Sequence, residues 1–275
     1  MTMRSILITG CSSGIGLAAA TTLKARGWRV LATARKAEDR ERLEREHQLE
    51  TIALELSDAA SVAACAETAI RLTDGKLKAL YNNAAYGIIG AMEDVTGDLL
   101  RRHLEVNVIG THELTRLIIP AMRRNGSGRI VNCSSVLGIV SGPYRGPYCA
   151  SKFALEAISD AMRFELAGSG IHVSLIEPGP THSNFLPSTL ATFKSTIDIA
   201  HSPHRDVYER KMKQMEAGEA SRFKLGPEAV VAKLIHALEN PRPKARYMVS
   251  IPTYGAAMLK RFLPGMLLDR VLARM

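Results

Sequence analysis

Short apolar runs alternate with longer segments of helical spacing along most of this chain, and that alternation limits the possible folds more than any other feature. Each run is too short and too apolar to be a strand of an exposed hairpin. Strand and helix patterns in alternation predict right-handed crossovers and a doubly wound parallel α/β sheet. The runs are SILIT (5–9), RVLATA (29–34), TIALE (51–55), KALYN (78–82), RIVNCS (129–134), HVSLIE (172–177) and RYMVSI (246–251).

The alternation weakens after Glu177, and the rest of the chain reads as additions to one domain. A less regular stretch is rich in Ser, Thr, His and Pro, and we expect a substrate lid at about 181–225. No linker or internal repeat divides the chain, so we expect one domain over 1–253 and an apolar helical appendage over 254–275. The apolar residues of the lid are Phe185, Leu186, Leu190, Phe193, Ile197 and Ile199.

The net charge of +9 is compatible with an anionic ligand, a membrane surface or nucleic acid. The densest charged stretch, 35–47, alternates in sign and is typical of a solvated helix face. Aromatic residues make up only 5% of the chain, and no nucleic-acid motif is present. We therefore expect no nucleic-acid partner.

Four widely spaced cysteines form no C-x-x-C pair, which argues against a disulfide framework or a zinc site. The chain opens directly on a strand pattern without a secretory leader. No apolar run reaches the ~18 residues of a transmembrane helix. These features predict a cytoplasmic protein without a bound metal.

A glycine-rich turn, TGCSSGIG (9–16), follows the first apolar run and precedes a helical pattern. Gly10, Gly14 and Gly16 permit a tight turn and let a pyrophosphate approach the backbone. The following helix would present unpaired N–H groups and a partial positive charge. The position of the turn favours a dinucleotide site over an ordinary turn.

With its G-x-x-x-G-x-G spacing, the turn resembles that of the short-chain dehydrogenase/reductase family, and further motifs agree in order and spacing over about 5–250. In the motif NNAA (82–85), Ala85 replaces the glycine that the family usually has at that position. These motifs are NNAA (82–85), NVIG (107–110), SS (134–135), YCASK (148–152) and PGPTHS (178–183).

This resemblance implies a Rossmann-type dinucleotide-binding and catalytic domain, usually a homodimer or homotetramer. It further implies a set of cofactor-binding positions, with Glu55 near the adenine in place of the family's aspartate. They are Gly10, Ser12, Ser13, Gly14, Ile15, Gly16, Arg35, Lys36, Glu55, Leu56, Asn83, Ala84, Ala85, Tyr148, Lys152, Pro178, Gly179, Thr181 and Ser183.

Two basic residues, Arg35 and Lys36, follow the second strand pattern, where a reader of the ribose 2′-hydroxyl would place Asp or Glu. A guanidinium can bind a 2′-phosphate through paired, charge-assisted hydrogen bonds. We therefore expect NADP(H) rather than NAD(H). The alternative is that both residues simply begin the charged helix.

Tyr148 and Lys152 are four residues apart and share one face of a helix. A neighbouring ammonium favours the phenolate, so we expect Lys152 to lower the pKa of Tyr148. By the same resemblance, Tyr148 is the general acid, Ser135 polarises the carbonyl, and Asn107 carries a water-linked proton relay. Asn107 could instead bind only a nearby carbonyl.

An apolar lid favours an apolar carbonyl or alcohol substrate, unless its residues pack into the core. The chain looks most like bacterial NADP-dependent aldehyde reductases and the retinol and 17β-hydroxysteroid dehydrogenase branch. We expect an NADPH-dependent carbonyl reductase. The alternatives are a retinol or 17β-hydroxysteroid dehydrogenase, or a redox-sensing NADPH-binding module without turnover. The segment 254–275 could contact a membrane surface, cover the substrate site or join subunits.

Overall fold

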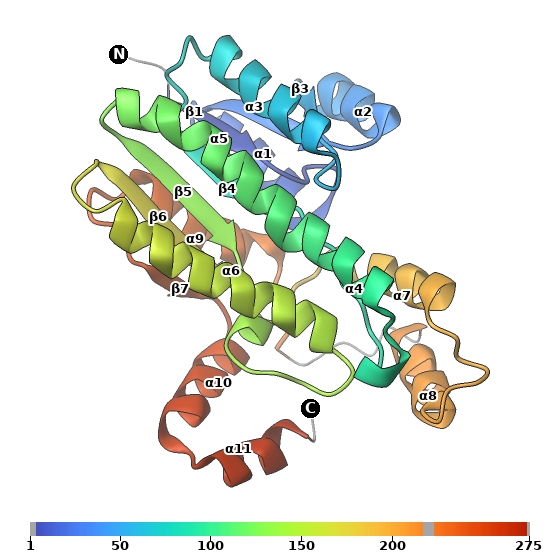
Figure 1. Ribbon diagram of the computed structural model, residues 1–275. Helices are drawn as coiled ribbons and strands as arrows, with labels where there is room; N and C mark the ends of the chain where they lie inside the picture. The colour runs from blue at the N-terminus through green and yellow to red at the C-terminus, as the bar shows by residue number, and fades with distance from the viewer. Residues whose placement is uncertain (1–3, 217–222, 274–275) are drawn as a thin grey trace.

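The computed structural model describes residues 4–216 and 223–273, and its centre is a seven-stranded parallel sheet (Figure 1). The strand order β3-β2-β1-β4-β5-β6-β7 runs outward from β1 in both directions. This order confirms the doubly wound α/β sheet predicted from the sequence. The strands are β1 (Ser5–Ile8), β2 (Arg29–Ala34), β3 (Glu50–Ala53), β4 (Ala79–Asn82), β5 (Gly128–Cys133), β6 (Ile171–Glu177) and β7 (Arg246–Met248).

Every apolar run of the sequence contributes a strand, but the last strand is shorter than the sequence suggests. β7 ends at Met248, and helix α10 already begins at Ile251. Pro252 lies in the first turn of that helix, where its missing N–H costs nothing, and Ser250 has the extended backbone of a cap residue. Helix initiation therefore ends the strand pattern early.

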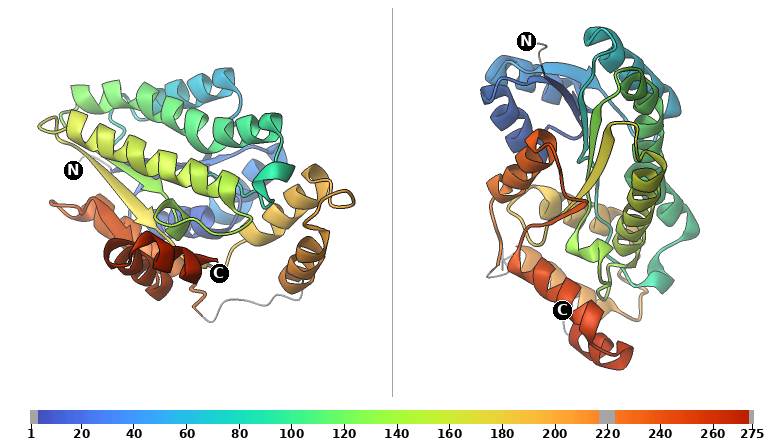
Figure 2. Two further views of the ribbon diagram at one scale, coloured as in Figure 1. Left: turned by 60° about the horizontal axis from the view of Figure 1, so that its bottom comes forward. Right: turned by 90° about the vertical axis from the view of Figure 1, so that its left-hand side faces the viewer.

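Helices cover both faces of the sheet, as the right-hand view of Figure 2 shows. One face carries α1 (Gly14–Ala25), α2 (Ala37–His47) and α9 (Pro227–Glu239), and the other carries α3 (Ala59–Leu72), α5 (Thr111–Arg124) and α6 (Gly146–Glu165). Successive side chains of a strand point to opposite faces. In β1, Ile6 and Ile8 accordingly join the first layer while Leu7 joins the second.

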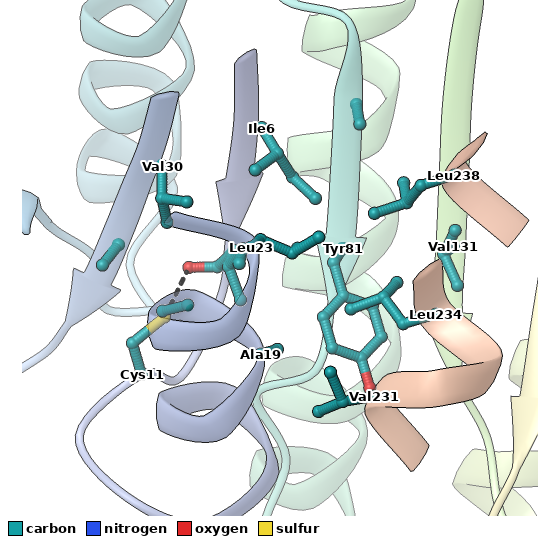
Figure 3. Packing of buried hydrophobic residues seen from close by; sticks show 14 of the residues in the cluster. Ile6, Cys11, Ala19, Leu23, Val30, Tyr81, Val131, Val231, Leu234 and Leu238 are labelled. Atoms are coloured by element: carbon teal, nitrogen blue, oxygen red, sulfur yellow. Dashed lines mark hydrogen bonds between the residues drawn. The ribbon is translucent and has the colours of Figure 1, made fainter. Parts of the chain in front are cut away.

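The packing between β1, β4, β5 and α9 is seen from close by in Figure 3. Val231 and Leu234 of α9 lie over Tyr81, and each of these side chains is at most 3% exposed. Cys11 donates a hydrogen bond from its thiol to the carbonyl of Ile8 (3.3 Å). Burial raises the pKa of Cys11 to about 12, so this thiol is unreactive at neutral pH.

Two shorter groups of elements lie beyond the carboxyl ends of the strands. One consists of η1 (Met92–Asp94), α4 (Gly97–Leu104), η2 (Glu105–Gly110), α7 (Phe185–Thr196) and α8 (Arg205–Glu216). The other consists of η3 (Val136–Gly138), α10 (Ile251–Phe262) and α11 (Gly265–Leu272). Within the described ranges, no helix is both long and apolar enough to cross a bilayer.

The segment expected to form a lid contains α7 and α8, and it shares a small apolar core with the segment after β4. Phe193, Ile197 and Tyr208 are buried together with Ile88 and Ile89 from the segment after β4. The Tyr208 hydroxyl accepts from the Ala91 N–H (2.7 Å) and donates to the Asp94 carboxylate. Part of the apolar lid therefore stabilises the fold instead of lining a substrate site.

Candidate active site

The glycine-rich turn lies between β1 and α1 and has the backbone that its glycines permit. Gly10 and Gly14 have φ values of +72° and +57°, in the left-handed region where other residues are strained. At Gly16 an added Cβ would lie 2.1 Å from the carbonyl oxygen of Gly10. Only glycine fits this close approach, so the turn cannot take side chains without moving.

The loop after β4 is tied to this turn by hydrogen bonds. The Thr9 hydroxyl accepts from the N–H groups of Asn83 and Ala84, both at 2.9 Å. The Asn83 side-chain amide donates to the carbonyls of Thr9 (3.0 Å) and Gly10 (3.2 Å). Ala85 is not among the residues with positive φ, so alanine is compatible with the backbone there.

The N-terminus of α1 offers the donors that a pyrophosphate needs. Ser13 has the extended conformation of a cap residue, yet its side chain makes no capping hydrogen bond, and no acidic residue lies in the first turn of α1. Ile15, in that same turn, packs on the core. Arg42 of α2 donates to the carbonyl of Ser12 (2.6 Å) and holds the turn from outside. The site therefore fits a dinucleotide phosphate by backbone shape and charge.

The basic pair after β2 is exposed at the same edge of the sheet. The Arg35 guanidinium lies 3.5 Å from the Glu55 carboxylate, which also accepts from the Ser57 N–H (3.1 Å) and hydroxyl (2.8 Å). Lys36 is the residue that precedes α2. Arg35 can therefore exchange Glu55 for another anion, such as a 2′-phosphate.

The segment after β6 crosses the glycine-rich turn. Ser183 faces Gly14, where an added Cβ would lie 3.0 Å from the Ser183 Cβ. The Pro178 carbonyl accepts from the Val136 N–H (2.8 Å), directly after Ser135. Thr181 donates from its hydroxyl to the Gly179 carbonyl (3.1 Å). The motif therefore joins the cofactor end of the site to its chemical end.

Tyr148 and Lys152 lie on the first turns of α6, and Ser135 follows β5. The Lys152 Nζ is 5.6 Å from the centre of the Tyr148 ring and donates to the Cys133 carbonyl (2.7 Å). The Ser135 hydroxyl accepts from the Leu137 N–H (3.1 Å) and interacts with the Tyr148 hydroxyl. The structure thus brings the three side chains together.

The pKa of Tyr148 differs from the sequence expectation. Burial raises this pKa far above the usual value of a phenol, with a further increase from Cys133. The hydrogen bond with Ser135 lowers the pKa, but by less than burial raises it. Burial also lowers the pKa of Lys152, whose ammonium is directed to the Cys133 carbonyl. The expectation that Lys152 lowers the pKa of Tyr148 is therefore wrong, because burial has the larger effect on this pKa.

Asn107 lies in the π-helical segment η2, and its side chain is held on both sides by the backbone of Tyr86. Its carbonyl oxygen accepts from the Tyr86 N–H (3.1 Å), and its amide donates to the Tyr86 carbonyl (2.9 Å). The same segment brings Gly110 against Leu56, where an added Cβ would lie 2.0 Å from the Leu56 carbonyl oxygen. The carbonyl contact expected as the alternative for Asn107 is thus present, while the water relay stays a prediction.

His103 is a site residue that the sequence argument did not identify. It is fully buried one turn before Asn107, with its Nε2 atom 3.0 Å from both the Tyr86 carbonyl oxygen and the Asn107 side-chain nitrogen. Its ring centre is 6.4 Å from that of Tyr148. Burial lowers the pKa of His103 to about 4, so the ring is neutral. The i, i+4 spacing to Asn107 was the only signal in the sequence.

Phe185 of α7 places an aromatic ring beside the phenol. The ring centres of Phe185 and Tyr148 are 5.3 Å apart. Met92 lies against Gly146, two residues before Tyr148, where an added Cβ would lie 2.2 Å from its sulfur. An apolar surface therefore borders the reactive hydroxyl.

Comparison with known proteins agrees with this geometry. A family model described as short chain dehydrogenase matches residues 4–192. The chain is 43% identical to the uncharacterized oxidoreductase YbbO of Escherichia coli strain K12, covering 98% of this chain and 94% of YbbO. It is 35% identical to human 17-beta-hydroxysteroid dehydrogenase type 1, covering 94% and 78%. A short-chain dehydrogenase structure from Streptomyces avermitilis superposes with a TM-score of 0.79 at 28% identity, covering 98% and 93%.

Proposed function

Since this chain belongs to the short-chain dehydrogenase family, we propose that it reduces an apolar aldehyde or ketone to the alcohol with NADPH. The observation that carries the proposal is the convergence of Ser135, Tyr148 and Lys152 beside the glycine-rich turn. When bound, the reduced nicotinamide supplies the hydride. The side chains of the protein bind and orient the substrate and protonate its oxygen.

Tyr148 is the proton donor in this proposal. Because burial raises its pKa, the phenol stays protonated at neutral pH and is ready to act as a general acid toward a developing alkoxide. Ser135, beside the phenol, donates to the same oxygen and stabilises its charge. Lys152 lies 5.6 Å from the phenol ring and provides positive charge when the proton leaves.

NADPH is proposed over NADH because of the charge around the end of β2. Arg35 and Lys36 are exposed there, and no acidic residue occupies either position. Glu55, the nearest carboxylate to Arg35, is already held by Ser57. A 2′-phosphate would replace one anionic partner of Arg35 by a stronger one.

The apolar surface made by Phe185 and Met92 next to Tyr148 supports an apolar substrate. Alkyl or aryl aldehydes are the first choice. A steroid ketone or retinal, the carbonyl partner of a hydroxysteroid or of retinol, is the second choice, favoured by the 35% identity to a 17-beta-hydroxysteroid dehydrogenase. Both choices need the same proton donor and cofactor.

The test is NADPH consumption with a panel of aldehydes, retinal and steroid ketones, for the wild-type protein and Tyr148→Phe. We expect turnover in the wild type and its loss in Tyr148→Phe, with NADPH binding retained in both by fluorescence titration. Equal turnover in both proteins would refute Tyr148 as proton donor. NADPH binding without turnover of any carbonyl would instead favour the redox-sensing module.

We also propose that the protein is a homodimer or homotetramer that associates through α5 and α6. Exposed apolar side chains on this side of the molecule, Ile109 beside Asn107 and Phe164 near the end of α6, support the proposal. The molar mass in solution from light scattering tests it, because a monomer at micromolar concentration would contradict it.

A further inference from the structure

The two last helices, α10 and α11, form what we call the C-terminal arm, and the arm turns its large apolar residues outward. In α10 the side chains that face the body are small, among them Thr253 and Ala256. The exposed side chains recur at intervals of three and four residues, which places them on one helical face. They are Ile251, Tyr254, Met258 and Phe262.

The second helix continues this surface. Leu272 and Leu268 pack inward against Val136 and Val140, in the segment after Ser135. The outward side chains are Met266, Leu267 and Val271. Figures 1 and 2 show the arm extending from the body below the sheet. A continuous exposed apolar surface of this kind is rare on a monomer and marks an interaction site.

Positive charge accompanies the apolar surface. Lys260, Arg261 and Arg270 lie on the arm against one acidic residue, Asp269, which leaves a net charge of 3 − 1 = +2 over 251–272. Arg261 and Arg270 are exposed beside Phe262 and Met266. Apolar side chains with flanking basic groups complement the interface of a bilayer that contains anionic lipids.

The arm is attached firmly enough to present this surface as a unit. The Lys260 ammonium donates to the Ile139 carbonyl (2.6 Å) and lies 4.7 Å from the centre of the Phe153 ring. At the other end of α10, the Ser250 hydroxyl lies so close to Gly179 that an added Cβ there would be 2.1 Å away. The helices are therefore positioned before any partner binds.

We propose that the C-terminal arm binds the surface of a membrane that contains anionic lipids, with the stripe of α10 in the interface. A second copy of the chain fits less well. Two arms packed face to face would place Arg261 and Arg270 at the edge of an apolar interface, with only Asp269 of each arm to pair with them. The membrane contact does not depend on which carbonyl the enzyme reduces.

The experiment measures binding of the full chain to vesicles of phosphatidylcholine, with and without phosphatidylglycerol, by co-sedimentation. We compare Met258→Ser and Phe262→Ser with Met92→Ser. Met92 and Met258 are matched, because they are 53% and 57% exposed, but Met92 lies outside the arm. We expect the wild type to bind anionic vesicles. Phe262→Ser and Met258→Ser should each weaken this binding about tenfold, and Met92→Ser should leave it unchanged.

Charge is tested separately with the double variant Arg261→Gln and Arg270→Gln. It should lose roughly thirtyfold in affinity for anionic vesicles, at about 1 kcal/mol per basic residue. The proposal is overturned if the wild type binds neither vesicle type, or if Met92→Ser weakens binding as much as Met258→Ser. It is also overturned if Phe262→Ser changes only the molar mass in solution, because the arm would then join two copies. Circular dichroism confirms that each variant is folded.

Discussion

At the scale of single residues, the proposed preference for NADPH rests on Arg35, and its replacement is a sharp test. We expect Arg35→Asp to raise the KM for NADPH ten- to a hundredfold, the size of a charged hydrogen bond of about 1.5–3 kcal/mol. The KM for NADH should fall or stay constant, since the aspartate can accept from a 2′-hydroxyl. Initial rates with both cofactors measure the change.

Arg45→Asp is the matched control for this charge reversal. Arg45 is exposed on α2 to a similar extent as Arg35, 70% against 69%, and pairs with Glu46 away from the glycine-rich turn. It changes the net charge by the same amount. If both variants shift the KM for NADPH equally, the effect is one of overall charge and Arg35 does not contact the 2′-phosphate.

The residues that sequence reasoning could place are those with a local signal. The spacing of Gly10, Gly14 and Gly16 predicts their turn. The spacing of four residues predicts that Tyr148 and Lys152 share a helical face. Arg42 has no such signal, and the i, i+4 spacing of His103 to Asn107 does not place His103 beside Tyr148. Arg42 reaches the turn only because α2 packs beside it, and His103 meets Tyr148 only because α4 and α6 pack together. The balance of burial and charge at Tyr148 likewise depends on packing that no motif encodes.

At the scale of elements, the small core of the lid predicts that α7 and α8 can be loosened separately from the sheet. Phe193 is 1% exposed and packs against the Tyr208 ring, with 5.0 Å between ring centres. Replacing it by alanine leaves a cavity worth about 3–5 kcal/mol. We expect Phe193→Ala to increase proteolysis within 185–216 and to raise the KM for the carbonyl.

Phe185→Ala separates packing of the lid from contact at the site. Phe185 is only partly buried and lies against Tyr148 outside the buried cluster of the lid. This variant should raise the KM for the carbonyl without added proteolysis. Equal cleavage of both variants would mean that the lid has no core of its own.

The strands were the most predictable elements and the lid the least. The five inner strands are buried apolar runs, and parallel strands covered on both faces need no alternation to be recognised. The edge strands β3 and β7 are less buried. The lid helices have mixed polarity, and Phe185 and Phe193 look alike in the sequence. One lies beside the phenol and the other in the buried cluster, which depends on how α7 lies on the segment after β4.

At the scale of the whole molecule, two buried groups make stability depend on pH in opposite directions. His103 has its pKa lowered by burial from 6.5 to about 4, so stability is lost as pH falls through this range. Glu177 has its pKa raised by burial, and further by Glu156, from 4.5 to about 7. Stability is therefore lost as pH rises from 4.5 to 7. Between about pH 4.5 and 6.5 the two groups therefore change the free energy of unfolding in opposite directions.

Replacing either His103 or Glu177 should reveal how the other side chain makes stability depend on pH. We expect Glu177→Gln to become more stable with rising pH between 4.5 and 6.5, and His103→Gln to become less stable. The full effect of His103 is about 3.5 kcal/mol, from a shift of 6.5 to about 4 at 1.4 kcal/mol per pKa unit. Urea denaturation at several pH values measures both slopes. Parallel curves for the two variants would show that these groups do not set the pH dependence.

The attachment of α10 has a thermodynamic consequence. One end of that helix touches Gly179 and the other holds Ile139, so the arm is fastened to the loop after β6 and to the loop that follows Ser135. Any adjustment of the arm on a bilayer then strains or relaxes those loops. Reciprocity requires that lipid changes the affinity for the dinucleotide by the same factor as the dinucleotide changes the affinity for lipid. Repeating the vesicle sedimentation at saturating NADPH, with no carbonyl present, would measure this factor as a change in the affinity for lipid.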